Sequence, residues 1–381
     1  MMRLALLLYD HNPHTGVQRD VRCITQALTI RGHHCRVYCL SWQGDVLDGM
    51  DLCLVPVSAG SRRGRSARFL QWVRNDLTNT PVDGIIGFNK MPGLDIYFTT
   101  SACYLEKAQQ RGRLYRRSAH FRHFAECEHA VFAPPGKTQI LLQAESQRDA
   151  YAKHYRLQPE RMHVVPPGVS PEWRLPEDAP QRRKAVRAQL GLEAQELTLL
   201  CVGSQFVAEG LDYAVTAFSR LRMEQPSVKA RLLVVGQGKY KPFQRLSRKL
   251  GVAESVEFLG DRNDVMDIML GADLLLYPAR GEAVGSVLLE ALVAGLPVVA
   301  TEACGYAPQI KAARAGIVLH SPLSQEDLDR AVMRFIDGIF RADCRSSALL
   351  YTRLTDMYSK YSQCAHLIEQ LLHSKHETHT Q

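Results

Sequence analysis

The sequence predicts an α/β protein with two doubly wound domains, each a parallel β-sheet with helices on both faces. Its 381 residues, 46% of them apolar, are too many for one ordinary core and suit two domains of roughly 150 to 200 residues each. Short apolar runs alternate with helical patterns along nearly the whole chain. This alternation is typical of a parallel sheet that is covered by helices.

The first domain is expected over residues 1–168. Val17, Val21, Ile24 and Leu28 recur at helical spacing between its first two strands, which predicts a right-handed crossover. The two prolines and the glycine in 164–168 can continue neither a helix nor a central strand, so they mark the domain linker. The predicted strands of this domain are residues 3–9, 35–41, 52–55, 84–88 and 96–99.

The second domain is expected over residues 169–345, and residues 324–372 are expected to be wholly helical. Residues 373–381 are polar and are expected to form a disordered tail. Two such domains in tandem leave a cleft between the carboxyl ends of their strands, which is where open parallel sheets bind ligands. The predicted strands of the second domain are residues 197–202, 232–235, 256–259, 274–277, 297–300 and 316–319.

Composition indicates the charge of the binding partner and the cellular compartment in which the protein is expected. A formal net charge of +8 and a pI near 9.0 indicate an anionic partner, and no recognised motif accompanies the charge to favour nucleic acid. The ten cysteines contain no Cys-x-x-Cys pair, so they are expected to be core residues in a reducing cytoplasm. No apolar run approaches the roughly 18 residues that a spanning helix needs, so any membrane contact is expected to be peripheral.

The most informative segment is 281–300, which follows the predicted strand 274–277. Gly285 lies in a strand-to-helix loop, and the helix is expected to begin near Ser286. Glycine permits close backbone approach and the first helical amides are unpaired, so this turn suits a diphosphate. Glu290, one turn inside, could accept two hydrogen bonds from a ribose diol, and Glu282 would face the sugar. The alternative is an ordinary turn glycine and a solvated helix glutamate.

Glu282 in Glu-Ala-x-Gly and Glu290 in Glu-Ala-x-x-Ala-Gly-x-Pro-Val-Val-Ala resemble the signature of glycosyltransferase family 4. This resemblance implies the GT-B fold, in which two Rossmann-like domains face a central cleft. It also implies that the last helices, residues 346–372, cross back to the first domain. Further segments are similar to the lipopolysaccharide core glucosyltransferases of the family: residues 16–20, 31–34, 87–95, 166–168, 262–265 and 304–307.

The resemblance implies a retaining, metal-independent transfer of glucose from UDP-glucose to a heptose of the lipopolysaccharide inner core, with no cofactor beyond the donor. No Asp-x-Asp stands where a metal would bridge the diphosphate, so backbone amides and basic side chains must meet its charge. Gly16 is expected to approach the donor phosphates. Asp20, expected beside the acceptor, and Glu282 are the candidate catalytic residues. The expected donor-binding residues are Gly16, Gly203, Glu282, Ala283, Gly285, Ser286, Val287 and Glu290.

One departure from the family concerns the two cations that precede the position of Gly210. Ala208 and Glu209 replace an Arg and a Lys that should contact the diphosphate. Two like charges about 4 Å apart repel by roughly 4 kcal/mol at an effective dielectric of about 20. Two hypotheses follow. Either neighbouring cations take over the phosphate, or the chain is a non-catalytic or weakly active relative that binds nucleotide or glycan. The candidate cations are Arg19, Lys239, Lys241 and Arg280.

Residues 104–132 interleave arginines with aromatic and apolar side chains. This mixture suits an anionic lipid surface or a phosphorylated glycan, and its alternative is a solvated helix with core aromatics. The resemblance implies membrane contact here, on the inner face of a bacterial inner membrane. The arginines of the segment are Arg111, Arg113, Arg116, Arg117 and Arg122. The residues expected to meet the acceptor or the membrane are Arg19, Asn89, Lys90, Arg113, Arg116 and Arg117.

Overall fold

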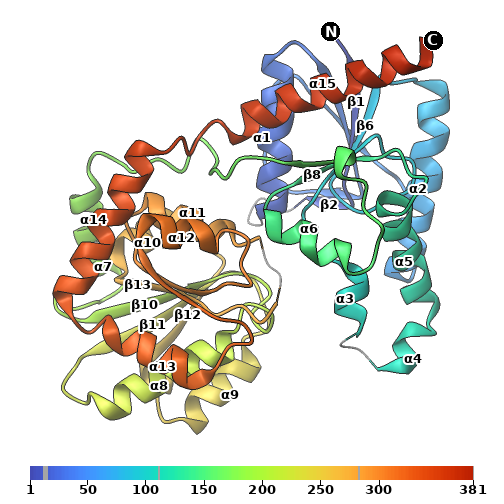
Figure 1. The fold of residues 1–381 in the computed structure, drawn as a ribbon. Helices are drawn as coiled ribbons and strands as arrows, with labels where there is room; N and C mark the ends of the chain where they lie inside the picture. The colour runs from blue at the N-terminus through green and yellow to red at the C-terminus, as the bar shows by residue number, and fades with distance from the viewer. Residues whose placement is uncertain (12–15, 110–111, 282–283, 381) are drawn as a thin grey trace. The chain divides into compact units, whose positions relative to one another are not determined.

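A computed structural model of the chain describes residues 1–11, 16–109, 112–281 and 284–380 (Figure 1). The chain divides into two compact units. Unit 1 comprises Met1–Ser170 and Ser359–Gln381, and unit 2 comprises Pro171–Tyr358. Each unit contains one main parallel sheet with helices on both faces, so the predicted fold class is confirmed.

The sheet of unit 1 has seven parallel strands in the order β5-β3-β1-β6-β7-β8-β9. Five of them were predicted from their apolar runs. The two strands at one end, β8 and β9, were not predicted. A separate two-stranded sheet pairs β2 (Asp10–His11) with β4 (Ser41–Trp42). The strands of the main sheet are β1 (Arg3–Leu7), β3 (His34–Cys39), β5 (Met50–Leu54), β6 (Gly84–Gly87), β7 (Ile96–Phe98), β8 (Gln139–Leu142) and β9 (Met162–Val164).

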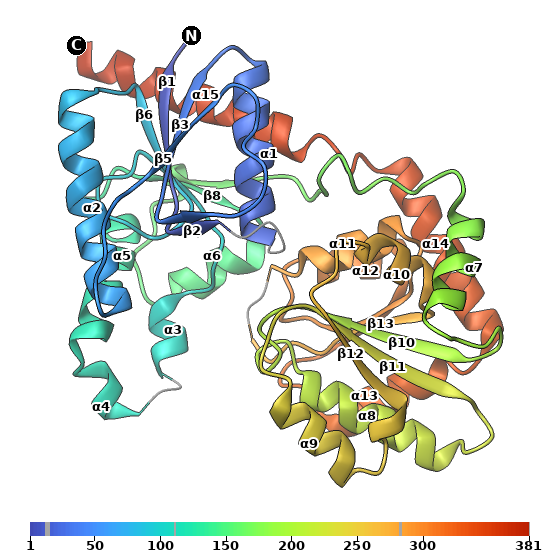
Figure 2. The same cartoon turned by 180° about the vertical axis from the view of Figure 1, so that it is seen from behind.

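Successive residues of β1 serve two different cores, because side chains alternate across a strand. Leu4 and Leu6 face a core that includes residues of α1 (Gly16–Ile30) and α15 (Lys360–Thr380). Ala5 and Leu7 face a second core, which is completed by α2 (Arg62–Asn79), α5 (Ala119–Phe132) and α6 (Glu145–Ala152). Figures 1 and 2 both show α15 lying beside α1.

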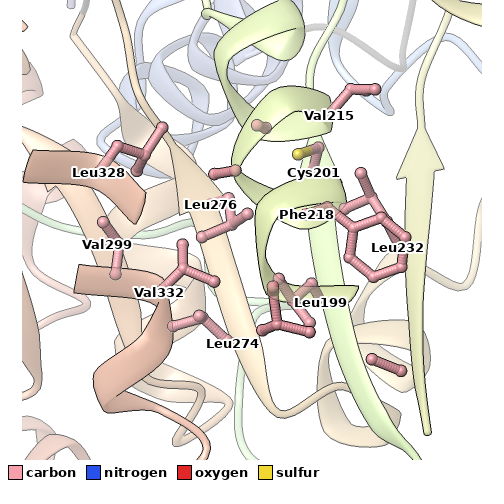
Figure 3. Close-up of a cluster of buried hydrophobic side chains, with 14 of the residues drawn as sticks. Leu199, Cys201, Val215, Phe218, Leu232, Leu274, Leu276, Val299, Leu328 and Val332 are labelled. Carbon is pink, nitrogen blue, oxygen red and sulfur yellow. The ribbon is translucent and has the colours of Figure 1, made fainter. Parts of the chain in front are cut away.

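The sheet of unit 2 has the order β12-β11-β10-β13-β14-β15, and every strand begins and ends within two residues of its prediction. Leu199 of β10 and Phe218 of α8 (Leu211–Glu224) lie in the core on one face of the sheet (Figure 3). The strands are β10 (Leu197–Val202), β11 (Ala230–Val235), β12 (Val256–Gly260), β13 (Leu274–Tyr277), β14 (Val298–Thr301) and β15 (Gly316–Leu319).

Helices cover both faces of this sheet (Figure 2). One face carries α8 (Leu211–Glu224), α9 (Lys241–Lys249) and α13 (Gln325–Arg334). The opposite face carries α7 (Ala179–Gln189), α10 (Val265–Gly271), α11 (Ser286–Val293), α12 (Ala307–Ala313) and α14 (Gly338–Leu354).

The C-terminal helices differ from the expectation in two respects. Residues 346–358 belong to unit 2, where Ala348 of α14 is fully buried, so only α15 lies in unit 1. The expected disordered tail is helical up to Thr380. The physical reason is that α15 is tied to unit 1 near its end: Leu372 is buried, and Lys375 Nζ lies 2.7 Å from Asp95 Oδ1.

The cysteines have the predicted role. Nine are buried, Cys53 is half-buried, and all ten are free thiols. Within the described ranges, no helix combines the length and the apolar character that crossing a bilayer requires.

Candidate functional site

Two loops of unit 2 meet where its strand order reverses. β10 is the first strand of the unit, and it pairs with β11 on one side and with β13 on the other. This reversal is the point at which open parallel sheets bind ligands. The loops after β10 and β13 touch there: Arg280 N donates to Ala208 O at 2.9 Å. At Gly210, with φ of 77°, a Cβ would lie 2.0 Å from Pro278 O.

Gly285 begins the helix that follows β13. It is the N-cap residue of α11. Its φ of 74° lies in the left-handed region, where a residue with a side chain would have a strained backbone. Gly285 is buried, Ser286 is half-buried and Val287 is 8% exposed. The turn therefore has the predicted order of strand, glycine loop and helix, and that it holds a diphosphate stays a prediction. Glu282 and Ala283, two of the predicted donor contacts, lie outside the described residues.

Glu290 lies in the second turn of α11 and is only 4% exposed. It adds a negative charge beside Tyr277 of β13, whose pKa is raised well above its usual value, mainly by burial. The alternative of a solvated helix glutamate is therefore wrong. That Glu290 binds a ribose diol stays a prediction.

Glu209 lies in the loop after β10, and its carboxylate accepts two backbone hydrogen bonds. Oε1 accepts from Ser204 N at 3.3 Å and Oε2 from Gln205 N at 3.1 Å. The carboxylate lies over Gly203, where an added Cβ would be 2.0 Å from Oε2. Burial raises the pKa of Glu209 to about 7, although both amide hydrogen bonds act in the opposite direction. Ala208, the other departure from the family, is exposed and carries no charge.

The cations proposed as replacements have different surroundings. Arg280 is paired: its guanidinium donates to both carboxylate oxygens of Asp212 and lies 4.5 Å from the Tyr213 ring centroid. Lys239 and Lys241 are exposed beyond the end of β11. The fourth candidate, Arg19, belongs to α1 of unit 1. The described ranges of the chain contain no group of three His, Cys, Asp or Glu side chains that could hold a metal ion.

Asp20 of unit 1 is buried and bound by the C-terminal helix. Its Oδ1 accepts from Tyr361 OH at 2.8 Å and from Lys360 Nζ at 3.1 Å. Lys360 also donates to Gln143 Oε1 at 2.9 Å, and its side chain is 1% exposed. The predicted role of Asp20 at the acceptor stays a prediction, and the structure adds that this carboxylate joins α1 to α15. Gly16, the first residue of α1, is half-buried.

Asn89 and Lys90 follow β6, at the reversal of strand order in unit 1. Asn89 Oδ1 accepts from Tyr9 N at 2.9 Å, which links the ends of two neighbouring strands. Lys90 donates to Ala102 O at 2.8 Å and to the carboxylate of Glu128. Lys90 is thus engaged within unit 1, whereas it was expected to meet the acceptor or the membrane.

Glu128 is a buried residue that sequence reasoning missed. It is fully buried in α5 and accepts hydrogen bonds from Lys90 Nζ, Leu105 N and Tyr155 OH. Buried carboxylates need such partners. The only sign of its burial in the sequence is its position among apolar residues, next to Cys127 and three positions before the pair 131–132.

Comparison with known proteins assigns the family. The family described as Glycosyl transferases group 1 matches residues 182–348. Lipopolysaccharide glucosyltransferase WaaG of Escherichia coli (strain K12) is 41% identical over 369 residues, which cover 96% of this chain and 98% of that protein. This chain belongs to glycosyltransferase family 4. The comparison therefore confirms the predicted resemblance to family 4 and the prediction that the chain is a glycosyltransferase.

Solved structures agree with this assignment. The crystal structure of WaaG, a glycosyltransferase involved in lipopolysaccharide biosynthesis, has a TM-score of 0.91 and 40% identity, covering 96% of this chain and 99% of that one. Sucrose-phosphate synthase from Thermosynechococcus elongatus has a TM-score of 0.79 at 16% identity, covering 98% and 100% of the two chains, and shares the fold. The predicted GT-B fold of two α/β domains is therefore confirmed.

The arginine-rich segment of this glycosyltransferase is divided between solvent and a small aromatic core. Tyr104 of α3 (Tyr104–Gln109) stacks on Phe121 with ring centroids 5.9 Å apart, and its OH lies 2.8 Å from Tyr115 OH. Leu114 of α4 (Arg113–Arg116) is 83% exposed. The aromatics thus pack on one another while the cations face water. Arg111 lies outside the described residues, and the exposed arginines are Arg113, Arg116, Arg117 and Arg122.

Proposed function

We propose that this glycosyltransferase moves glucose from UDP-glucose to a heptose of the lipopolysaccharide inner core, with retention of the anomeric configuration. The observation that carries the proposal is 41% identity to a lipopolysaccharide glucosyltransferase over 96% of this chain and 98% of that protein. The similarity extends over both units, so it covers the proposed acceptor-binding unit 1 as well as the proposed donor-binding unit 2.

The donor would bind at the strand reversal of unit 2. Its diphosphate would lie against the turn at Gly285 and the first amides of α11, where the helix dipole favours an anion. The ribose diol would bind Glu290, and the sugar would lie near Glu282. Negative charge that develops on the departing UDP would be stabilised by these amides, which is electrostatic catalysis without a metal. The further donor contacts would come from Gly203, Ala283, Ser286 and Val287, and from Gly16 of unit 1.

The acceptor would bind unit 1, near Asp20, Arg19 and Asn89. Because Asp20 is already held by Lys360 and Tyr361, its carboxylate is fixed in position before any acceptor arrives. The exposed arginines 113, 116, 117 and 122 would bring the enzyme to the anionic inner face of the inner membrane.

The test is a reaction of purified protein with UDP-glucose and lipopolysaccharide truncated at the heptose. Product mass, free UDP and the anomeric configuration of the new bond are measured together. We expect one added hexose for each UDP released, in the α configuration of the donor. UDP release without a heavier product would show hydrolysis, and transfer to an acceptor without heptose would contradict the proposed acceptor. Glu254→Gln, an exposed change in unit 2, serves as the control for protein quality.

A further inference from the structure

Glu209 occupies a small anion site formed by the backbone of its own loop. Two successive amides, Ser204 N and Gln205 N, point to its two carboxylate oxygens at 3.3 and 3.1 Å. Consecutive amides that converge in a turn form a concavity that binds anions such as phosphate. The concavity follows β10 and lies over Gly203, next to the strand reversal. An anion of the chain itself therefore occupies amides of this loop.

The surroundings of the carboxylate make its negative charge costly. Cys201 of β10, Cys304 after β14 and Tyr277 of β13 all have pKa values raised by the charge of Glu209 in addition to their burial. Glu290 of α11 adds a second carboxylate beside Tyr277. None of these four groups is a cation. The Arg280 guanidinium, from the adjoining loop, is paired with Asp212 instead.

We propose that Glu209 is an internal anion of the donor site, and that the donor diphosphate gains the amides of Ser204 and Gln205 only when this carboxylate is protonated or moves away. The inference rests on the proposed function, because it assumes that a nucleoside diphosphate sugar binds at the reversal between β10 and β13. Under this proposal, the affinity for the donor depends on the protonation state of Glu209 and therefore on pH. The family carries a cation at this position.

The direction of the pH dependence follows from the charge. With a pKa of about 7, Glu209 is largely neutral at pH 6 and largely ionised at pH 8. An anionic donor binds the neutral form better, so its affinity falls as pH rises through about 7. If only the protonated form binds, the loss approaches tenfold for each pH unit above that value. Glu209→Gln keeps the size of the side chain and removes the charge, so its donor affinity is expected to be nearly independent of pH.

The experiment is calorimetric titration of the full chain with UDP-glucose between about pH 5.5 and 8.5. UDP-glucose is the probe because its diphosphate is esterified at both ends and keeps the same charge over this range, unlike UDP. Wild type, Glu209→Gln and the control Glu254→Gln are compared. Glu254 is an exposed residue of unit 2, so the control removes the same charge away from the amides. We expect the control to follow the wild type, and Glu209→Gln to bind at least tenfold tighter at pH 8.5.

The outcomes separate the two proposals. Equal binding of UDP-glucose by the wild type at all pH values would overturn the role of Glu209 and leave the proposed function intact. This outcome can be read from the wild type alone, without either variant. The same steep profile in Glu209→Gln would also overturn it, since another group would then be titrating. Absence of UDP-glucose binding in all three proteins at every pH would overturn the proposed function together with the inference.

Discussion

Glu290 is a carboxylate within a helix whose neighbouring side chains, Leu288, Leu289 and Ala291, are apolar and fully buried. Burial of a carboxylate is unfavourable without partners that offer hydrogen bonds. Its position in the second turn of α11, close to Gly285, suits the predicted hydrogen bonds to the two hydroxyl groups of a ribose. Glu209, on the loop after β10, has its carboxylate bound by two backbone amides.

The first prediction concerns Glu290→Ala. We expect UDP binding to weaken by about 1 to 3 kcal/mol, because two charge-assisted hydrogen bonds to the ribose would be lost. Calorimetry measures the change, and Glu254→Ala, an exposed site in the same unit, is the matched control. Unchanged affinity for UDP in Glu290→Ala would remove this residue from the donor site.

The second prediction restores the cations of the family. In the double variant Ala208→Arg and Glu209→Lys, a carboxylate is replaced by an ammonium, and a planar guanidinium is added beside it. Charge develops on UDP as it leaves, so turnover is expected to rise about 10²- to 10³-fold, the size typical of one oxyanion contact. This gain adds to the tighter donor binding expected above about pH 7 once the Glu209 carboxylate is removed. Steady-state kinetics of both proteins on one acceptor give kcat and KM separately. A wild type that is already fast, with a variant no faster, would show that other groups meet the phosphate charge.

At the scale of the element, α4 and the start of α5 present cations to solvent over a core of stacked aromatics. The aromatic side chains that interleave with the arginines in the sequence are half-buried and pack on one another, so membrane attraction would come mainly from charge, with Leu114 as an exposed apolar side chain. Electrostatic attraction of this kind depends on anionic lipid and weakens as salt rises.

The third prediction tests this segment with vesicles. We expect wild type to bind vesicles that contain anionic lipid better than neutral vesicles, and less as salt is added. The triple variant Arg113→Gln, Arg116→Gln, Arg117→Gln should lose most of this binding in a sedimentation assay. A control that changes Arg245, Arg248 and Lys249 of α9 to Gln removes three exposed charges from unit 2. Equal loss in both variants would indicate net charge alone, and equal binding to both lipids would favour an ordinary solvated surface.

At the scale of the whole molecule, the chain returns to unit 1 after completing unit 2. Helix α15 contributes five side chains to the first core of unit 1, and Lys360 joins it to α1 through Asp20. A second link lies further along the helix, where Glu369 accepts from Arg31 and His33, and these partners lower the pKa of its carboxyl to about 2. The two ends of the sequence are therefore parts of one domain. The core residues of α15 are Tyr361, Cys364, Ala365, Ile368 and Leu372.

The fourth prediction concerns the stability of unit 1. Removal of residues 359–381 exposes the surface that Tyr361, Ile368 and Leu372 cover, at about 1.5 to 3 kcal/mol for each large side chain. That sum is comparable with the whole stability of a domain, about 5 to 15 kcal/mol. We expect scanning calorimetry to show loss of the unit 1 transition while that of unit 2 remains. The single change Lys360→Ala should cost about 3 to 5 kcal/mol, because it leaves Asp20 buried without its cation. An unchanged unit 1 transition in both proteins would contradict this account of α15.

The sequence by itself determined the two α/β domains, all six strands of unit 2 and the turn at Gly285. These features are local: an apolar run marks a buried strand, and a glycine before a helical pattern marks a close turn. It did not predict β8 and β9, which the structure shows paired with β7 and with each other at one end of the sheet.

Only the tertiary structure decided which charges are already paired. Lys360 lies 340 residues from Asp20, and Arg280 lies 68 residues from Asp212, so no spacing in the sequence connects them. Glu209 is only four or five residues from Gln205 and Ser204, whose amides bind its carboxylate. Its residue type nevertheless predicted only a negative charge that would repel a phosphate. The turn after β10 aims two amides at that carboxylate, and burial at the strand reversal raises its pKa. The protonation state of Glu209 and the position of its carboxylate both depend on the folded backbone, because the hydrogen bonds and the desolvation that set them arise only when the chain is packed.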